Sequence, residues 1–215
     1  MSSVVIIDYG SGNLRSAGKA FERAAQESGL ADGVTVSADP AALAQASHIV
    51  LPGVGAFAEC MRGLADLPGM LEALAEEVLR KAKPFLGICV GMQLMAERSL
   101  EHGVHKGLGW IAGEVVPLAP SDPALRIPHM GWNELEIVSG GHPVLQDIGP
   151  GTHVYFVHSY AISCREAGVV RAQVEYGGKV AAVVARDNMV GTQFHPEKSQ
   201  AAGLKLIRNF LAWRP

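Results

Sequence analysis

Short, almost uninterrupted apolar runs alternate with helical patterns in the first half of the chain, and they constrain the fold most. Predicted buried strands are residues 4–8, 48–52 and 84–88. Predicted helices are residues 14–28, 70–83 and about 91–99. Strands that are apolar along their whole length and joined by helices indicate a parallel sheet covered on both faces.

The second half of the chain is richer in strand signals. Predicted strands are residues 113–118, 133–138, 153–160, 169–176, 179–187 and 189–194, and a closing helix is expected at 201–212. We therefore expect one α/β domain over residues 1–215. It would be a three-layer sandwich, with helices on both faces of a mostly parallel central sheet and a smaller antiparallel strand region.

Composition excludes several classes of function. Hydrophobic residues make up 48% and charged residues 18% of 215 residues, which is typical of a compact soluble protein. The formal charge is −3 with scattered lysines and arginines, so neither nucleic acid nor a membrane surface is an expected partner. The first apolar run is too short for a signal sequence or a membrane span, and three cysteines without CxxC spacing indicate no disulfide framework. We expect a cytoplasmic protein.

Cys89 follows the predicted strand 84–88 and opens a predicted helix, with Gly87 and Gly91 on either side. Gly-Ile-Cys-Val-Gly has the form of a nucleophile elbow with cysteine in place of serine. The glycines let backbone come close where a Cβ would clash, and a helix N-terminus favours thiolate over thiol. A buried structural cysteine, the commoner fate of a free cysteine, is the alternative.

His195 and Glu197 follow the predicted strand 189–194. Residues i and i+2 of an extended chain point the same way, so both side chains can face one site. A cysteine nucleophile needs an imidazole to hold its proton, and a carboxylate fixes the tautomer of that imidazole. The alternative is a surface turn at Pro196 with solvated charges. A cysteine and a His-x-Glu that each follow a buried strand favour a nucleophilic site where the strands end.

GICVGMQL and FHPEKS resemble the two signatures of the class I (triad-type) glutamine amidotransferases. The resemblance implies that a cysteine attacks the side-chain amide of glutamine, ammonia leaves, and water hydrolyses the glutamyl thioester. It implies Cys89 as nucleophile, His195 as general base and acid, and Glu197 as the residue that orients His195. We expect neither a cofactor nor a metal.

The segment LPGVGAF, residues 51–57, places Gly53 and Gly55 around Val54. Glycine admits positive φ, so the peptides of this loop can reorient and aim N–H groups at a developing oxyanion. The N–H of Val90, after the nucleophile, would join them. Spacing alone favours a simple strand-to-helix turn, but the resemblance reverses this preference because the family has an oxyanion strand here. We expect the oxyanion hole at Val54, Gly55 and Val90.

Two further motifs are rejected. YGSGN, residues 9–13, suggests a phosphate loop, but Arg15 stands where the dinucleotide fingerprint needs glycine. Glu101, His102 and His105 could be proposed as metal ligands, but a glycine-broken loop with histidines is more often simply polar.

DYGSGNLRS, LPGVGAF, HKGLGW, RIPHMGWN and YFVHSY together resemble the glutaminase subunits of imidazole glycerol phosphate synthase, the HisH-type chains of histidine biosynthesis. No synthase pattern accompanies them, so we expect the acceptor chemistry on a separate chain. The resemblance implies a heterodimer with a (β/α)8-barrel cyclase. Ammonia released at Cys89 would react there to give imidazole glycerol phosphate and an aminoimidazole carboxamide ribotide (AICAR).

The resemblance also implies which residues meet the substrate and the partner. The expected substrate-binding residues are Gly53, Gln93, Glu101, His158, Ser159 and Tyr160, the last three at the α-carboxylate end of glutamine. The expected partner-facing residues are Asn13, Trp132 and Lys198. Without the resemblance, Trp132 is more typical of a core aromatic and Lys198 of a solvated lysine.

Two other functions stay open. A cysteine hydrolase acting alone on a γ-glutamyl substrate would need a wide cleft and full activity without a partner. A non-catalytic interaction subunit would be favoured by a triad that lacked its Cys, His or Glu. Because all three residues are present, the non-catalytic subunit is the least favoured of the three hypotheses.

Overall fold

The computed structural model describes residues 3–29, 33–138 and 141–215. Its strands are β1 (Ser3–Ile7), β2 (Gly33–Ser37), β3 (His48–Gly53), β4 (Phe85–Cys89), β5 (Ala96–Ser99), β6 (His105–Lys106), β7 (Ile111–Pro117), β8 (His129–Glu134), β9 (Glu136–Ile137), β10 (His153–His158), β11 (Tyr160–Cys164), β12 (Val170–Glu175), β13 (Lys179–Arg186) and β14 (Met189–Thr192).

Six α-helices lie within the described residues: α1 (Leu14–Ser28), α2 (Pro40–Gln45), α3 (Phe57–Ala65), α4 (Met70–Leu74), α5 (Val90–Gln93) and α6 (Gln200–Ala212). A π-helix, η1 (Ala75–Arg80), continues α4, and short 3-10 turns are η2 (Pro143–Leu145), η3 (Ala167–Val169) and η4 (Pro196–Lys198).

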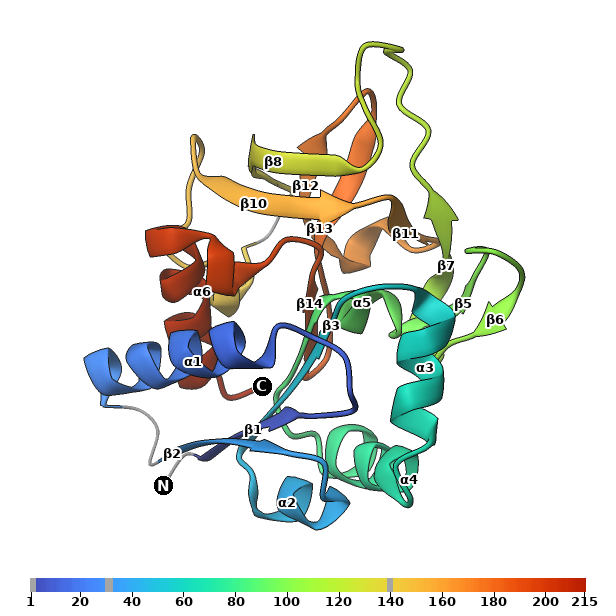
Figure 1. Cartoon of the computed structure of the whole chain (residues 1–215). Coiled ribbons are helices and arrows are strands. Elements are labelled where there is room, and N and C mark those ends of the chain that lie inside the picture. The colour runs from blue at the N-terminus through green and yellow to red at the C-terminus, as the bar shows by residue number, and fades with distance from the viewer. Residues whose placement is uncertain (1–2, 30–32, 139–140) are drawn as a thin grey trace.

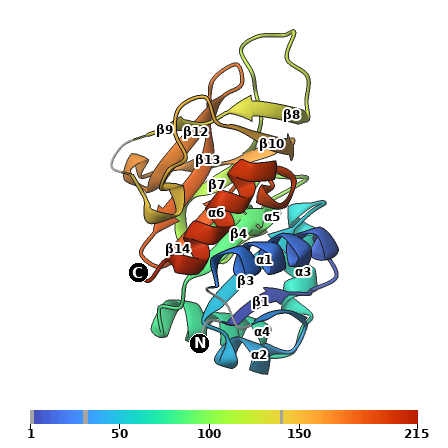
Figure 2. The ribbon, with the colours of Figure 1, turned by 90° about the vertical axis from the view of Figure 1, so that its left-hand side faces the viewer.

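The central sheet has the strand order β2-β1-β3-β4-β14-β13-β12-β9. Pairing is parallel from β2 to β14 and antiparallel from β14 to β9. In Figures 1 and 2, α1 and α6 lie side by side on one face of this sheet, and α3 and α4 lie on the other in Figure 1. The strands β1, β3 and β4 are buried almost throughout. The expected three-layer α/β fold is confirmed.

Two smaller sheets stand beyond the carboxyl ends of the parallel strands (Figure 1). One pairs β8 with β10 in antiparallel register, and the other has the order β11-β7-β5-β6. They are the expected antiparallel region, although β5 and β7 pair in parallel. Together they form a wall above the strand ends of the central sheet.

Most predicted elements are confirmed with shifted ends. The strand expected at 133–138 is instead divided between β8 and β9, which belong to different sheets, and one predicted helix is wrong. The helix expected at 91–99 ends at Gln93 in α5, and Ala96–Ser99 is strand β5. The backbone of this segment bonds to the chain that follows it: Gly109 N–H donates to Ala96 O at 3.0 Å, and Gly107 N–H to Glu97 O at 2.9 Å. A Cβ on Gly107 would lie 2.2 Å from Ala96 O, so the glycine permits this approach. Tertiary pairing thus overrides local helix propensity.

The sequence patterns do not predict β2, β6, α2 or α3, and they cover only the first residue of β11. The strand β2 lies at the sheet edge with no buried residue, so it lacks the apolar run that marks β1 and β3. The helix α2 begins with clear local signals, because Pro40 is its first residue and Asp39 accepts the N–H of Ala41 at 2.9 Å.

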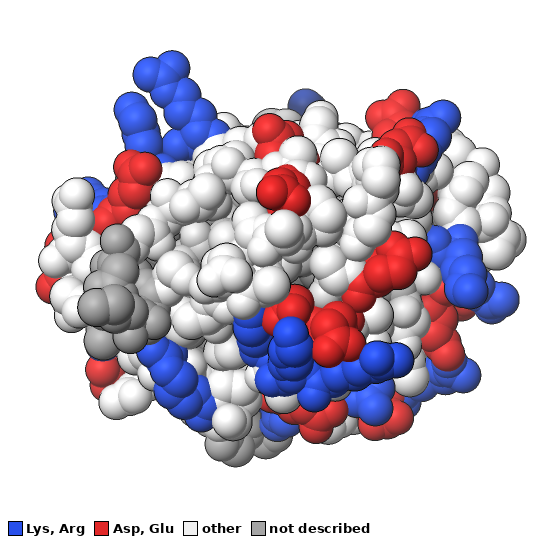
Figure 3. All heavy atoms as spheres, turned by 90° about the horizontal axis from the view of Figure 1, so that it is seen from below, with Lys and Arg blue, Asp and Glu red and all other residues white. Residues whose placement is uncertain are grey.

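Charged residues of both signs are interspersed on the face seen in Figure 3, which shows no single-sign patch. Among the described residues, no helix is long and apolar enough to cross a membrane.

Candidate active site

Three neighbouring parallel strands bring the sequence motifs together. In the register of the central sheet, Gly53 at the end of β3 pairs with Cys89 at the end of β4. On the other side of β4, Ile88 pairs with Thr192, the last residue of β14. The carboxyl ends of parallel strands lie at one edge of a sheet. The loop after β3, the cysteine and the segment that contains His195 therefore meet at one place.

Cys89 has a backbone conformation typical of a nucleophile elbow, with φ of 54° and ψ of −110°. The turn is closely packed on both sides. A Cβ on Gly91 would lie 1.8 Å from Leu51 O, and a Cβ on Gly87 would lie 2.6 Å from Gly91 O. The two glycines are needed for space, since neither has a positive φ. The thiol is buried, and the side-chain amide of Gln193 donates to its sulfur at 3.6 Å.

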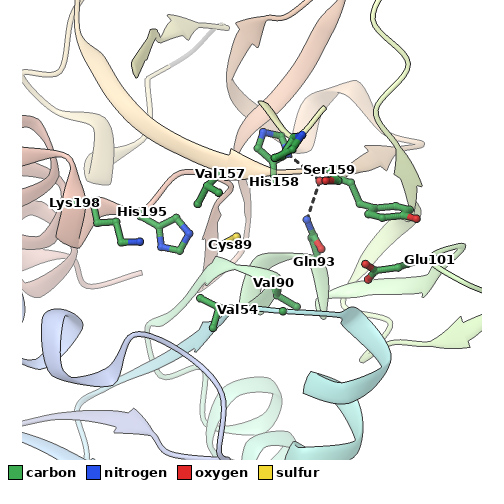
Figure 4. A pocket seen from close by; sticks show the side chains of 13 residues that line it. Val54, Cys89, Val90, Gln93, Glu101, Val157, His158, Ser159, His195 and Lys198 are labelled. Carbon is green, nitrogen blue, oxygen red and sulfur yellow. Dashed lines mark hydrogen bonds between the residues drawn. The ribbon is translucent and has the colours of Figure 1, made fainter. Parts of the chain in front are cut away.

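His195 and Glu197 form a buried pair. The Nδ1–H of His195 donates to Glu197 Oε1 at 2.8 Å, and both side chains are 2% exposed. This bond leaves Nε2 as the nitrogen that can serve a nucleophile, and within the described residues Nε2 has no hydrogen-bond partner. Figure 4 shows the imidazole beside Cys89. Burial lowers the pKa of His195, but Cys89 and Glu197 raise it by more, to about 9.

The backbone of His195 is also held firmly. Its N–H donates to Tyr155 O at 3.0 Å, and its carbonyl accepts the hydroxyl of Ser199 at 2.7 Å. The same Ser199 hydroxyl accepts the N–H of Tyr155 at 3.0 Å. The imidazole is thus fixed by the strand β10 as well as by its carboxylate.

The N–H of Val54, an expected oxyanion donor, is engaged elsewhere. It donates to Ser11 Oγ at 3.2 Å, and the Ser11 hydroxyl donates to Val54 O at 2.6 Å. The Cys60 thiol reaches the same carbonyl at 3.3 Å. Because a backbone N–H carries one hydrogen, the Val54 donor is not available to an oxyanion in this conformation. Gly55 follows with φ of +92°.

A cavity of about 320 Å³, suited to a small molecule, lies between these strand ends and the wall of smaller sheets (Figure 4). It is lined by Val54, Gly55, Cys89, Val90, Gln93, Glu101, Pro128, Val157, His158, Ser159, Tyr160, His195 and Lys198. The cavity therefore has a thiol and an imidazole on one side and a strand-to-strand turn, residues 158–160, on the other.

A buried amide chain connects that turn to the thiol. Gln93 Nε2 donates to Tyr160 O at 2.9 Å and to Gln193 Oε1 at 3.1 Å, and Gln193 in turn donates to Cys89. Gln193 was not among the residues selected from the sequence. It follows β14 without any motif that marks it, and only the neighbouring position of β4 brings it to the sulfur.

The family model for class-I glutamine amidotransferases matches residues 5–213. This chain belongs to the class-I glutamine amidotransferases. Curated relatives named imidazole glycerol phosphate synthase subunit HisH are 59% identical in Rhodospirillum rubrum over 212 residues and 60% identical in Brucella suis over 215 residues. Each match covers 99% of both chains, which places this chain among the HisH proteins.

Solved structures show that the amidotransferase fold is shared well beyond close relatives. A glutamine amidotransferase crystal structure matches with a TM-score of 0.73 at 18% identity, covering 97% of both chains. A glutamine amidotransferase from Thermotoga maritima matches with a TM-score of 0.66 at 21% identity, covering 91% of this chain and 76% of that one.

Three residues that were expected to contact the substrate are also held by other parts of the protein. Gly53 does not line the cavity; a Cβ there would lie 2.7 Å from the Tyr9 hydroxyl and 2.8 Å from Gly91 N, so it permits close packing. The imidazole of His158 is bonded on both nitrogens to protein groups. Glu101 lines the cavity, and its Oε2 also accepts the N–H of Phe57 at 2.6 Å, at the start of α3.

The three residues expected to face a partner differ in how exposed they are. Trp132 is 47% exposed, so the alternative that makes it a core aromatic is wrong, and its side chain is accessible to a partner. The Trp132 ring meets the Tyr155 ring edge-on, with 5.9 Å between the ring centres. The Lys198 ammonium lies 5.7 Å from the centre of the Tyr155 ring. Asn13 is half-buried directly before α1, a helix in contact with the η4 turn that carries Lys198.

No group of three or more His, Cys, Asp or Glu side chains that could hold a metal ion occurs in the described part of the chain. His102 and His105 lie in the loop and short strand that follow β5.

Proposed function

We propose that this chain is the glutaminase subunit of imidazole glycerol phosphate synthase, which hydrolyses glutamine at Cys89 and passes the ammonia to a cyclase partner. The observation that carries the proposal is the meeting of three strand ends at one cavity, where Cys89, the His195–Glu197 pair and the loop at Val54 lie together. The HisH relatives, similar over 99% of their length, supply the name of the assembly.

In the proposed reaction, the Cys89 thiol gives its proton to His195 Nε2, and Sγ attacks the side-chain amide carbon of glutamine to form a tetrahedral intermediate. His195 donates a proton from Nε2 to the departing ammonia, which leaves a glutamyl thioester. Its raised pKa means that the imidazole holds this proton at neutral pH. His195 then takes a proton from the water that hydrolyses the thioester, while Glu197 stabilises the imidazolium and keeps the ring oriented.

The oxyanion of the tetrahedral intermediate needs backbone donors close to Cys89. We assign Val90 N–H and a peptide of the Val54–Gly55 loop to this role. Because Ser11 holds the Val54 N–H in the present conformation, the loop has to reorient before it can donate. The free chain is therefore expected to be a poor glutaminase, and a partner that favours the reoriented loop would activate it.

Exposed apolar side chains near the cavity mouth suit such a partner. Met130 is 62% exposed, Trp132 47% and Val54 40%. Val54 lines the cavity, and Met130 pairs across the strands with Val157, which lines it too. Apolar side chains gathered in one region of a surface are typical of interaction sites. We propose that the (β/α)8-barrel cyclase docks here, so that ammonia passes directly from the cavity into the barrel.

The test is steady-state glutamine hydrolysis by the chain alone, with the cyclase barrel, and with the barrel plus the cyclase substrate. We expect a steep rise along this series, on the order of the 10²–10³-fold that one oxyanion donor contributes. Equal rates in all three mixtures would instead favour a hydrolase that acts alone on γ-glutamyl substrates.

A further inference from the structure

His129 is a buried histidine that the proposed reaction does not use. It opens β8, is 3% exposed and sits directly opposite His158 of β10 in the antiparallel register. Its ring is stacked between Tyr176, at 3.9 Å, and Phe156, at 4.7 Å between ring centres. The two neighbouring rings thus hold the plane of the imidazole, and its two nitrogens make its hydrogen bonds.

Hydrogen bonds around the two histidines can run in only one direction. Tyr160 O is an acceptor, so the 2.9 Å contact requires a hydrogen on His158 Nδ1. A neutral His158 then accepts at Nε2, and the 3.0 Å contact requires His129 Nδ1 to be the donor. Burial lowers the pKa of each histidine to about 4, so both rings are neutral near pH 7 and carry one hydrogen each.

Asn133 lies at the other end of this series of hydrogen bonds. Its Oδ1 accepts the N–H of Glu134 at 2.8 Å, and its Nδ2 donates to Glu175 O at 3.0 Å, which sets the orientation of the amide. The second hydrogen on Nδ2 is directed to His129 Nε2 at 3.3 Å. Donation therefore runs from Asn133 through His129 and His158 to the Tyr160 carbonyl.

This series of hydrogen bonds ends at the carbonyl oxygen of Tyr160, a residue that lines the substrate pocket. Tyr160 O accepts from His158 and also from Gln93, the residue whose amide leads through Gln193 to the nucleophile. Tyr160 and His158 enclose Ser159 in the turn between β10 and β11, and all three line the cavity. A shift of the Tyr160 carbonyl would disturb both the turn and the orientation of Gln93.

We propose that His129 is a positioning residue for the glutamine pocket, which acts through His158 to hold the Tyr160 carbonyl and the β10–β11 turn in the orientation that receives the substrate. The inference rests on the proposed glutaminase function of the same cavity. His129 does not touch the reacting atoms, so it governs substrate binding more than the chemical step.

The experiment uses the complex with the cyclase barrel and its substrate, and compares three variants. His129→Phe keeps a flat ring between Tyr176 and Phe156 but removes the donor. His129→Asn loses the ring but places an amide nitrogen where Nδ1 stood. His48→Phe is the matched control, because His48 is also fully buried but lies at the start of β3, where it bonds to Ser47.

For His129→Phe we expect KM for glutamine to rise about tenfold, with kcat changed less than about twofold, because a buried acceptor at His158 Nε2 loses its donor. His129→Asn should show the smaller rise in KM, even though it loses more packing and unfolds at a lower temperature. His48→Phe should lower the thermal midpoint and leave KM unchanged. A KM that follows thermal stability across the three variants would overturn the proposal.

A second measurement needs no variant. Nitrogen chemical shifts of the imidazoles in the unmodified chain should show the Nδ1–H tautomer for both His129 and His158 near pH 7. An Nε2–H tautomer in either ring would overturn the proposal, because the chain of donors would be broken. If the unmodified complex has no glutaminase activity at all, the proposed function fails and the positioning role with it; an active complex with unchanged KM in His129→Phe overturns the positioning role alone.

Discussion

Cys89 combines an unfavourable backbone conformation with a central place in the site. A positive φ on a residue with a Cβ costs on the order of 1–3 kcal/mol and persists only where the surroundings determine it. Here the surroundings are the β4 strand, the α5 helix and the glycines that let them approach. The strained turn directs the sulfur to the cavity edge beside His195 (Figure 4).

Cys89→Ala is expected to abolish glutamine hydrolysis and to leave the fold intact. Its thiol makes one weak hydrogen bond, so the thermal midpoint should change by no more than about 2–4 °C, the shift for about 1 kcal/mol in a domain of this size. In complex with the barrel, the variant should still support cyclisation when an ammonium salt replaces glutamine. Cys164→Ala, at a half-buried cysteine that does not line the cavity, is the control and should retain hydrolysis. Normal glutaminase activity in Cys89→Ala would contradict the assignment.

Glu197→Gln should lower glutamine hydrolysis less than His195→Ala does, because His195 transfers the protons and Glu197 only orients the His195 imidazole. Proton transfer by a positioned side chain typically contributes about 10²–10⁴-fold. Glu197 raises the pKa of His195, so its neutral replacement lowers that pKa. Hydrolysis requires the protonated imidazole, and the alkaline limb of kcat/KM should therefore lie near pH 9 in the unmodified enzyme and move to lower pH in Glu197→Gln. A limb that stays in place would reassign Glu197 to a structural role.

At the scale of elements, the loop between β3 and α3 carries the peptide that we propose reorients when the partner binds. Its Val54 peptide is held by side chains from elsewhere: Ser11 before α1 and Cys60 within α3. The Tyr9 hydroxyl donates to Pro52 O at 2.6 Å and holds the end of β3. These contacts stabilise an orientation in which the Val54 N–H cannot serve the oxyanion.

Ser11→Ala is expected to raise glutaminase activity of the free chain by about 5- to 150-fold, because it removes two hydrogen bonds to Val54 that each stabilise the resting orientation by about 0.5–1.5 kcal/mol. The fully activated complex should change little, since its loop has already reoriented. Cys60→Ala, which removes only the weaker sulfur contact, should give a smaller rise. Lower activity of the free Ser11→Ala chain would mean that Ser11 supports the active loop instead.

At the scale of the whole molecule, the cavity lies between the central sheet and the wall made by the smaller sheets (Figure 1). The wall supplies the β10–β11 turn on its inner side and exposed Met130 and Trp132 on β8. One small region of the fold thus carries both the substrate pocket and the surface that we assign to the partner.

Trp132→Ala is expected to weaken binding of the cyclase barrel by about 1–3 kcal/mol, in the range of an aromatic residue at an interface centre. Titration calorimetry or surface binding measures this directly. Ammonium-dependent cyclisation at saturating concentrations of both chains should be unchanged. Leu79→Ala removes a side chain of similar exposure, 49%, on the helix η1 and should not affect binding. Equal losses in the two variants would place the partner elsewhere.

The fold class and the chemistry-bearing segments can be predicted from the amino-acid sequence. Uninterrupted apolar runs can be buried only within a covered sheet, which is why β1, β3 and β4 were predictable, and the glycines around Cys89 indicated a crowded turn. Strand ends also placed His195 and Glu197 at one edge. These properties are local, because they depend on residues within one or two turns of each other.

Which segments become neighbours, and the direction of the hydrogen bonds between them, depend on the tertiary fold. Gln193 meets Cys89 across 104 positions of the chain only because β14 lies beside β4. Ser11 holds the Val54 peptide, and His158 turns to His129, through bonds between segments distant in sequence. Trp132 is exposed because its strand has one face outside the core, which no local pattern reveals. Strand order and bond direction arise from pairing between distant segments, and local propensity does not encode either.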